Sequence, residues 1–342
     1  MKNIKAYLVL LLLLSSTTIA FAQRENPISI STEARSDLMY TSLGKDIVKG
    51  ESGFKGYIFN LILKGEISPR FSYMYRQRLN SLNRDLSFFD SVDMMFLNYH
   101  MTPNLSLTAG KGPVFVGGWE LDLAPIDCFF LSSFNYHYSP YQWGVSMAYS
   151  FPKDILSVQL CQSPFQATYV QHSGQPANLF AYSLKWYGRH GLYEPNWSVN
   201  MMEYAPGNFI NYISLGNKFH IARNLQLELD YMNRAAKGHQ FFAQDFTLVG
   251  KVNYQPIEKL NLYAKGTYDL NKIESDADLI VLKGTDIVRV GGGIEYYPLR
   301  NKNVRLHGIY SYSFGRNPQP QAFVRDNLSM LNIGVTWRVK VL

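Results

Sequence analysis

The stretch VRLHGIYSYSF (304–314) decides the fold, because residues of two kinds alternate along it. Every second residue from Val304 to Phe314 is apolar, aromatic or glycine, and most of the residues between them are polar or charged. A period of two is the signature of a β-strand with one apolar and one polar face. The same alternation recurs at 57–64, 71–78, 225–231 and 331–340. No comparable stretch keeps a helical period, so the sequence predicts an all-β protein.

The connections between the alternating segments are of two kinds. Short turns are expected at 67–70, 101–104, 151–154, 188–192, 220–224, 255–259 and 298–303. Longer loops are expected at 41–53, 81–90, 112–139, 163–177, 233–243, 271–285 and 315–327, with a shorter loop at 203–208. Seven turns and eight loops imply sixteen strands, with Ile28–Met39 as the first. This rhythm is typical of a transmembrane antiparallel β-barrel with short periplasmic turns and long extracellular loops.

A soluble β-sandwich or propeller is the alternative, and three features argue against it. The strands are about ten residues long, close to the ~9–11 residues that cross a bilayer obliquely. The face opposite the apolar one is polar or charged, whereas the inside of a soluble sandwich is apolar. Aromatic residues make up 15% of the chain, against 17% charged residues. They cluster near strand ends, as interfacial girdles do, at Tyr57, Tyr99, Trp143, Tyr149, Trp186, Trp197, Tyr254, Tyr296 and Trp337.

The N-terminus predicts export. MKNIKAYLVLLLLLSSTTIAFA (1–22) has two lysines, a short apolar run and an Ala-Phe-Ala cleavage site, as in a secretory signal peptide. We therefore expect a cleaved segment 1–22 and a single barrel domain, 23–342, in lipid of the bacterial outer membrane. The apolar run is too short to be a membrane anchor. The net charge of +7 is too small and too dispersed for a nucleic-acid partner.

A sixteen-stranded barrel is wide enough to hold water, and the polar face of each strand then lines the lumen. This face carries twelve cations, Arg35, Lys64, Arg76, Arg78, Lys185, Lys218, Lys251, Lys265, Arg289, Arg305, Arg338 and Lys340. It carries six anions, Glu33, Glu66, Glu228, Asp230, Asp269 and Glu295. The excess favours weak anion preference. The alternative is that the charges pair across neighbouring strands and only keep the lumen wet. Arg76 and Arg78, two residues apart on one strand, are the foremost candidates for contact with a solute.

Catalysis and cofactor binding find little support in the sequence. TAGKGPVFVGG (108–118) lacks the spacing of a Walker loop or a dinucleotide-binding turn, and Gly291–Gly293 lies inside an alternating strand. The seven histidines are scattered, and no H-E-x-x-H, C-x-x-C or G-x-S-x-G motif occurs. We therefore expect no enzyme, no cofactor and no metal. Cys128 and Cys161 fit no metal spacing; they pair in an oxidising compartment or, as we favour, remain isolated thiols.

Several runs resemble one family. TAGKGPVFVGGWELDLAPID (108–127), FSYMYRQRLN (71–80), LSFFDSVDMMFLNY (86–99) and LSVQLCQSPF (156–165) are similar to segments of the phosphate-selective porin O/P-like family of Gram-negative outer membranes. The resemblance implies a sixteen-stranded porin that forms a homotrimer. It also implies a long third loop, here 112–139, that folds into the lumen and narrows the channel.

Two functions follow as hypotheses. The first is a passive porin for small hydrophilic solutes, including phosphate-like anions. The second is a non-conducting outer-membrane barrel that serves as a docking or assembly partner of a secretion or surface complex. Glu120 and Asp122 on the third loop would oppose anion preference unless they pair with Lys111, Arg76 or Arg78. The full set of pore-lining candidates is Arg76, Arg78, Lys111, Glu120, Asp122, Lys251, Lys265, Arg289 and Arg305.

Overall fold

A computed structural model describes residues 28–81, 90–274, 276–319 and 322–342. The predicted signal peptide 1–22 and most of the predicted loop 81–90 lie outside these described residues. No helix in the described part of the chain is long and apolar enough to cross a membrane.

The described chain is almost entirely antiparallel sheet, and its sixteen long strands follow one another in chain order. They are β1 (Ile28–Leu43), β3 (Gly53–Ser68), β4 (Phe71–Arg78), β5 (Val92–His100), β6 (Leu105–Pro113), β7 (Tyr141–Ser150), β8 (Asp154–Gln162), β9 (Phe180–Gly188), β10 (Tyr193–Ala205), β11 (Asn208–Ala222), β12 (Leu225–Ala236), β13 (Asp245–Ile257), β14 (Leu260–Asn271), β15 (Asp286–Tyr296), β16 (Val304–Arg316) and β17 (Leu328–Lys340). The two-residue strand β2 (Asp46–Ile47) lies in the first loop and pairs with β1. The helices are short: η1 (Leu79–Ser81), η2 (Pro125–Asp127), α2 (Ser133–His137) and α3 (Gln166–Ser173).

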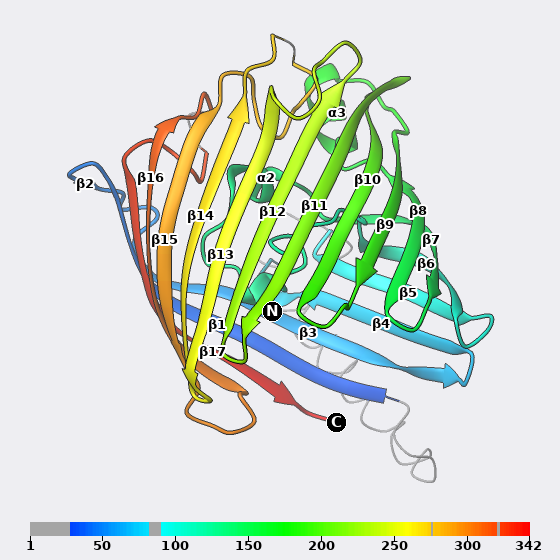
Figure 1. Ribbon diagram of the computed structural model, residues 1–342, viewed down its shortest axis with the longest axis horizontal. Coiled ribbons are helices and arrows are strands. Elements are labelled where there is room, and N and C mark those ends of the chain that lie inside the picture. The colour runs from blue at the N-terminus through cyan, green and yellow to red at the C-terminus, as the bar shows by residue number, and fades with distance from the viewer. Residues whose placement is uncertain (1–27, 82–89, 275, 320–321) are drawn as a thin grey trace, which may run out of the picture.

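The sheet closes on itself. β1 pairs with β3 on one side and with β17 on the other, from Ser31 opposite Lys340 to Leu43 opposite Leu328. The wall surrounds the segment that carries α2 (Figure 1). Closure leaves no sheet edge, so every strand finds its backbone partners within the wall, as a lipid environment requires. The predicted fold class, the count of sixteen strands and the position of the first strand are confirmed.

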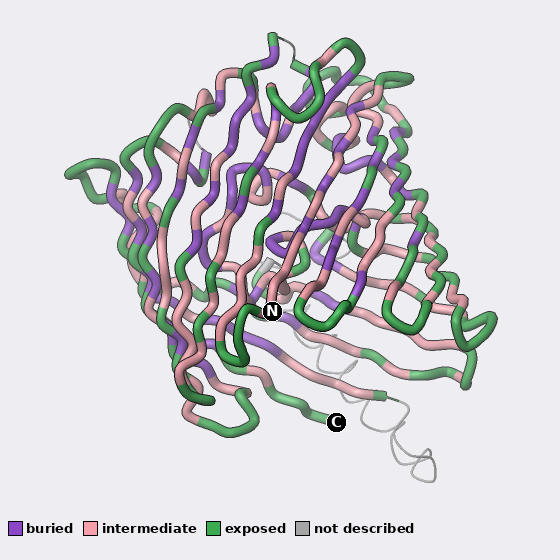
Figure 2. The backbone as a smooth tube through the Cα atoms, in the orientation of Figure 1, coloured by how far each residue is buried: buried purple, intermediate pink, exposed green. Residues whose placement is uncertain are grey.

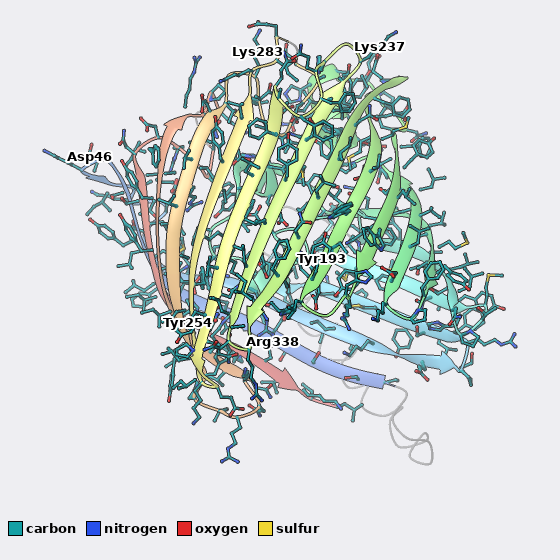
Figure 3. The ribbon with its side chains drawn as sticks, viewed as in Figure 1. Asp46, Tyr193, Lys237, Tyr254, Lys283 and Arg338 are labelled. Atoms are coloured by element: carbon teal, nitrogen blue, oxygen red, sulfur yellow. The ribbon has the colours of Figure 1, made fainter. Side chains whose placement is uncertain are left out.

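The two kinds of residue that alternate along 304–314 lie on opposite faces of the wall. Leu306 and Tyr310 in β16 are 46% and 51% exposed, whereas Arg305 and Ser311 are buried. Figure 2 shows the same exchange of buried and exposed positions along neighbouring strands, with exposed turns at both ends. Figure 3 places Lys237 and Lys283 in loops at one end of the barrel and Tyr254 at the other. The outward apolar face is the face that lipid covers in a transmembrane barrel.

Two register shifts change which residues face inward. The shift between Arg35 and Ser36 leaves Tyr57 as an extra residue of β3, and its ring lies 4.0 Å from the Arg35 guanidinium. The prediction that Tyr57 belongs to the outer aromatic girdle is therefore wrong. The shift between Arg76 and Gln77 leaves Asp93 as an extra residue of β5. A β-bulge re-aims the side chain of the residue it inserts.

The interior is only partly polar. An apolar cluster fills the barrel beside β8–β12, where Phe134 and Val116 of the β6–β7 loop pack against Met202, Ile210 and Tyr212 of the wall. Ala277, Ile280 and Val281 from the β14–β15 loop complete the cluster. The prediction that the inner face is polar is therefore wrong at the loop end of these strands. Most buried charged residues of the wall lie instead on β12–β16, β1, β4 and β5.

Candidate functional site in the barrel interior

The segment 114–140 between β6 and β7, called the third loop below, contacts the inner face of the wall along most of its length. Gly110 lies three residues before the end of β6, where φ is +134° and an added Cβ would overlap the Met95 carbonyl oxygen. Only glycine combines this backbone angle with such a close approach. The α2 helix in the loop is capped by Ser132, whose hydroxyl accepts a hydrogen bond from the Asn135 N–H.

Two buried carboxylates of the wall accept hydrogen bonds from the backbone of the third loop. Asp230 in β12 accepts from the N–H groups of Trp119 (2.9 Å) and Glu120 (2.8 Å). Asp269 in β14 accepts from the N–H of Ser133 at 2.8 Å, in the first turn of α2. Backbone donors without a partner inside a protein are costly, so these carboxylates stabilise the loop in its position against β12–β14.

Two glycines allow the loop to approach the wall closely. A Cβ on Gly117 would lie 2.5 Å from the Asn196 carbonyl oxygen, and one on Gly216 in β11 would lie 2.7 Å from the Gly118 Cα. The Gly117 N–H donates to the Ser198 hydroxyl at 2.8 Å. Backbone therefore packs on backbone here, where no side chain larger than hydrogen fits.

Glu120 forms a buried ion pair with Lys265 of β14. The Lys265 Nζ lies 2.6 Å from the Glu120 Oε1 and also donates to the Phe130 carbonyl at 2.8 Å. Burial opposes ionisation of Glu120, but Lys265 and the hydrogen bonds from Ser132 outweigh it and hold the pKa of the carboxyl below its usual range. The expected partners of Glu120, namely Lys111, Arg76 and Arg78, are not the partners it has.

Arg35 of β1 and Arg305 of β16 hold the central part of the loop. Arg35 donates to the carbonyls of Ile126 (3.1 Å) and Cys128 (2.6 Å). Arg305 lies 2.9 Å from Asp127 and 3.0 Å from Glu295. Because each guanidinium presents its donors in a fixed fork, it serves two acceptors at once.

Arg289 and Lys251 have a different environment. Arg289 is 2% exposed and donates to the Ser311 hydroxyl at 3.0 Å. Lys251 lies 5.1 Å from the centre of the Tyr263 ring. Among the residues that the structure describes, neither cation lies within ion-pair distance of a carboxylate. Both therefore contribute positive charge that no direct partner neutralises.

Arg76 and Arg78 share one carboxylate. Their Nη2 atoms lie 3.4 Å and 3.2 Å from Asp93 Oδ2, and the Arg76 guanidinium covers the Tyr141 ring at 4.9 Å. Arg76 is buried, whereas the side chain of Arg78 is 36% exposed. Of the pair, Arg78 is the one that a solute in the interior would meet.

Lys111 lies on the outer face of the wall instead of in the lumen, and Asp122 has another partner than the cations expected for it. Lys111 stands in register with Trp143, whose side chain is exposed on the outer face. The prediction that Lys111 lines the lumen is wrong, because Lys111 lies on the same face of β6 as the outward-facing Leu105 and Leu107. Asp122 points into the interior and lies 3.9 Å from Lys185, with its side chain 50% exposed. Solvent screens such a pair strongly.

Three cavities surround the third loop. The upper cavity, about 610 Å³, reaches from Glu51 and Phe323 at the loop end down to the third loop. The lower cavity, about 260 Å³, lies toward the turn end. Both are lined by Leu123, Cys128, Phe129 and Leu131, so the two cavities meet at this part of the loop. A side cavity of about 300 Å³ is lined by Arg76, Lys185 and Asp122.

Sequence reasoning missed several charged residues of the interior. Asp37 contacts Arg35 (3.0 Å) and His307 (2.9 Å) in the β1 wall, and it continues the inward parity that already included Arg35. Arg234 pairs with Asp245 and Asp278 at 2.7 Å and 2.8 Å. Arg234, Asp245 and Asp278 lie in or beside the predicted loops 233–243 and 271–285, where no alternation indicates which side of the wall a residue faces. Asp93 had no signal, because its bulge reverses the strand parity.

Cys128 and Cys161 are both free thiols, so the alternative of a disulfide between them is wrong. Cys128 is enclosed by the third loop and the wall, and burial raises the pKa of its thiol to about 12. Cys128 therefore remains protonated at neutral pH, and both cysteines act as small apolar side chains.

One group of side chains resembles a hydrolase relay in composition only. Ser72 and Asn98 both approach the Nε2 of His100, at 3.4 Å and 3.0 Å. In a catalytic relay the nucleophile and the orienting group contact different ring nitrogens of the histidine. This arrangement therefore does not activate Ser72.

No family model and no curated protein sequence matches this chain. Solved structures do. OmpT of Vibrio cholerae is 12% identical, with a TM-score of 0.62 over 92% of this chain and 99% of that one. The anion-selective porin from Comamonas acidovorans is 10% identical, with a TM-score of 0.63 over 91% and 99%. A mutant Rh. blastica porin is 11% identical, with a TM-score of 0.54 over 91% and 100%. At these identities the likeness concerns the fold: this chain is a closed, sixteen-stranded transmembrane β-barrel of the architecture seen in outer-membrane porins.

Proposed function

We propose that the protein is an outer-membrane porin, a passive diffusion channel for small hydrophilic solutes with a weak preference for anions such as phosphate. The observation that carries the proposal is the pair of cavities on either side of the third loop, which share Leu123, Cys128, Phe129 and Leu131. Solutes would enter the upper cavity, pass this part of the loop and leave through the lower cavity. The third loop would then be the constriction.

The charges that line the cavities support the anion preference. The lower cavity has four cations, Lys251, Lys265, Arg305 and Arg338, against Asp127 and Glu295. The upper cavity has Lys55, Arg78 and Arg289 against Glu51 and Glu120. Many of these charges are paired, which keeps the excess modest. A positive lining lowers the free energy of an anion in a pore relative to that of a cation.

Location and assembly belong to the same proposal. The signal-peptide pattern of 1–22 supports export to the outer membrane. A homotrimer is supported by the likeness to a structure of OmpT described as a trimer form, with a TM-score of 0.61. Size-exclusion chromatography with light scattering in detergent would measure the assembly directly.

Single-channel recording in planar bilayers tests the function. The purified barrel is expected to give discrete current steps in KCl, and its reversal potential in a salt gradient should indicate anion preference. A cation-selective reversal potential would refute the preference. A barrel that gives no steps and co-purifies with a protein complex would instead support the docking role.

A further inference from the structure

The upper cavity is lined by aromatic rings that rest on buried arginines. The Tyr57 ring has the Arg35 guanidinium at 4.0 Å from its centre, and the Tyr141 ring has that of Arg76 at 4.9 Å. Arg35 and Arg76 are only 1% and 5% exposed, while both tyrosines line the cavity. A solute in this cavity therefore meets ring edges and faces before it meets these two guanidinium groups.

A stacked pair of rings extends the aromatic lining to the loop end. Phe323 of the β16–β17 loop stacks on Tyr136 of the third loop, with ring centres 5.0 Å apart and planes at 18°. The Arg289 guanidinium lies 5.7 Å from the Tyr136 ring centre. Phe323 remains 59% exposed. An apolar ring left exposed beside a cavity has a free surface on which another ring can stack.

The cations that a solute can reach are Arg78 and Lys55, which line the same cavity. Its two carboxylates are already neutralised within the protein. Glu51 is held by Arg325 at 2.7 Å, and Glu120 is held by Lys265 at 2.6 Å. Arg78 shares the single carboxylate of Asp93 with Arg76, so the three groups together keep a net positive charge. The cavity thus combines stacking surfaces with a small excess of accessible positive charge.

We propose that the upper cavity is a binding site for small aromatic carboxylates, in which the ring of the solute stacks on Phe323 and neighbouring tyrosines and its carboxylate meets Arg78 or Lys55. The site rests on the proposed porin function and names the class of solute that would be retained on its path. An inorganic anion uses only the two accessible cations, whereas an aromatic carboxylate uses both features of the lining. The volume of about 610 Å³ lies within the usual range of small-molecule sites.

Two probe anions separate ring stacking from charge. Benzoate and cyclohexanecarboxylate carry the same carboxylate on a six-membered ring, but only benzoate is flat and aromatic. Added to the loop side of the barrel in a planar bilayer, benzoate should reduce the chloride current at concentrations about three- to tenfold lower than cyclohexanecarboxylate, as one aromatic contact allows. Equal inhibition by the two anions would overturn the proposal.

Variants test whether the stronger inhibition by benzoate arises in the upper cavity. Phe323→Leu should abolish most of the difference between the two anions, and Arg78→Gln should weaken inhibition by both. Phe54→Leu is the matched control, because Phe54 is 85% exposed and does not line the cavity. An unchanged difference in Phe323→Leu would overturn the site. Absence of any chloride current would refute the porin function, whereas chloride current without preference for benzoate would refute only this inference.

Discussion

Lys265 of β14 and Glu120 of the third loop form an ion pair of 2.6 Å in which each side chain is only 5% exposed. Their sequence separation is large, so the pair joins the loop to a distant part of the wall. Water is largely excluded from both groups, and within the part of the chain that the structure describes neither charge forms a second ion pair. The loop is therefore held against the wall by charge as well as by backbone hydrogen bonds.

Replacement of one partner should loosen the third loop. In Lys265→Met the Glu120 carboxylate loses its cation while it remains buried, which costs roughly 3–5 kcal/mol in comparable pairs. We expect a lower urea midpoint for unfolding in detergent and faster protease cleavage between β6 and β7. The double variant Lys265→Met/Glu120→Leu should recover much of the loss, because it removes both charges. Unchanged cleavage in the single variant would contradict the anchoring role.

The same pair predicts a pH dependence of loop docking. The pKa of Glu120 in the folded barrel lies below its usual value of about 4.3. A carboxyl with a lowered pKa stabilises the folded state above its unfolded pKa, and this contribution is lost as the pH falls through the folded pKa. We therefore expect protease cleavage of the loop to increase as the pH falls below the usual glutamate pKa of about 4.3.

Glu120→Gln is the control for this pH dependence. It removes the titrating group but keeps the shape of the side chain, so its cleavage should change less between pH 5 and pH 3 than that of the unmodified protein. The comparison is needed because other buried carboxylates, including Asp230 and Asp269, also contact the loop. A pH response of the same size in both proteins would assign the effect to those groups.

Ion selectivity should respond to Asp93. Asp93→Asn removes the carboxylate that Arg76 and Arg78 share, so the accessible charge of Arg78 should act more strongly on ions in the upper cavity. The reversal potential should shift toward anions in Asp93→Asn and toward cations in Arg78→Gln. Lys111→Met is the matched control: it removes a cation of the outer face and should leave the reversal potential unchanged.

Much of the fold was readable from the sequence because each strand carries its own alternation. The sixteen strands and the positions of turns and loops follow from local pattern, and the pairing of β1 with β17 closes the sheet. Lys265, Arg289 and Arg305 are buried on the inner face, the side that strand parity indicates, and their contact with a solute stays a prediction.

The contacts inside the barrel were not readable, for physical reasons that differ from residue to residue. Asp93 and Tyr57 face inward because bulges reverse the parity of their strands, and a bulge has no clear mark in the sequence. The partner of Glu120 depends on where the third loop lies, which long-range contacts decide. Met202 and Ile210 face inward although they are apolar, because the third loop covers them.

Close packing between Gly216 and the third loop gives the last prediction. In Gly216→Ala the new Cβ would lie 2.7 Å from the Gly118 Cα and 2.9 Å from the Asn196 carbonyl oxygen, so the loop must move away from β11. Overpacking of this kind costs about 1–3 kcal/mol. The displaced loop should narrow the upper cavity and reduce the single-channel current. Gly308→Ala, in β16, is the matched control because its Cβ would meet no atom within 4 Å. Equal currents in the two variants would show that the loop does not limit conduction.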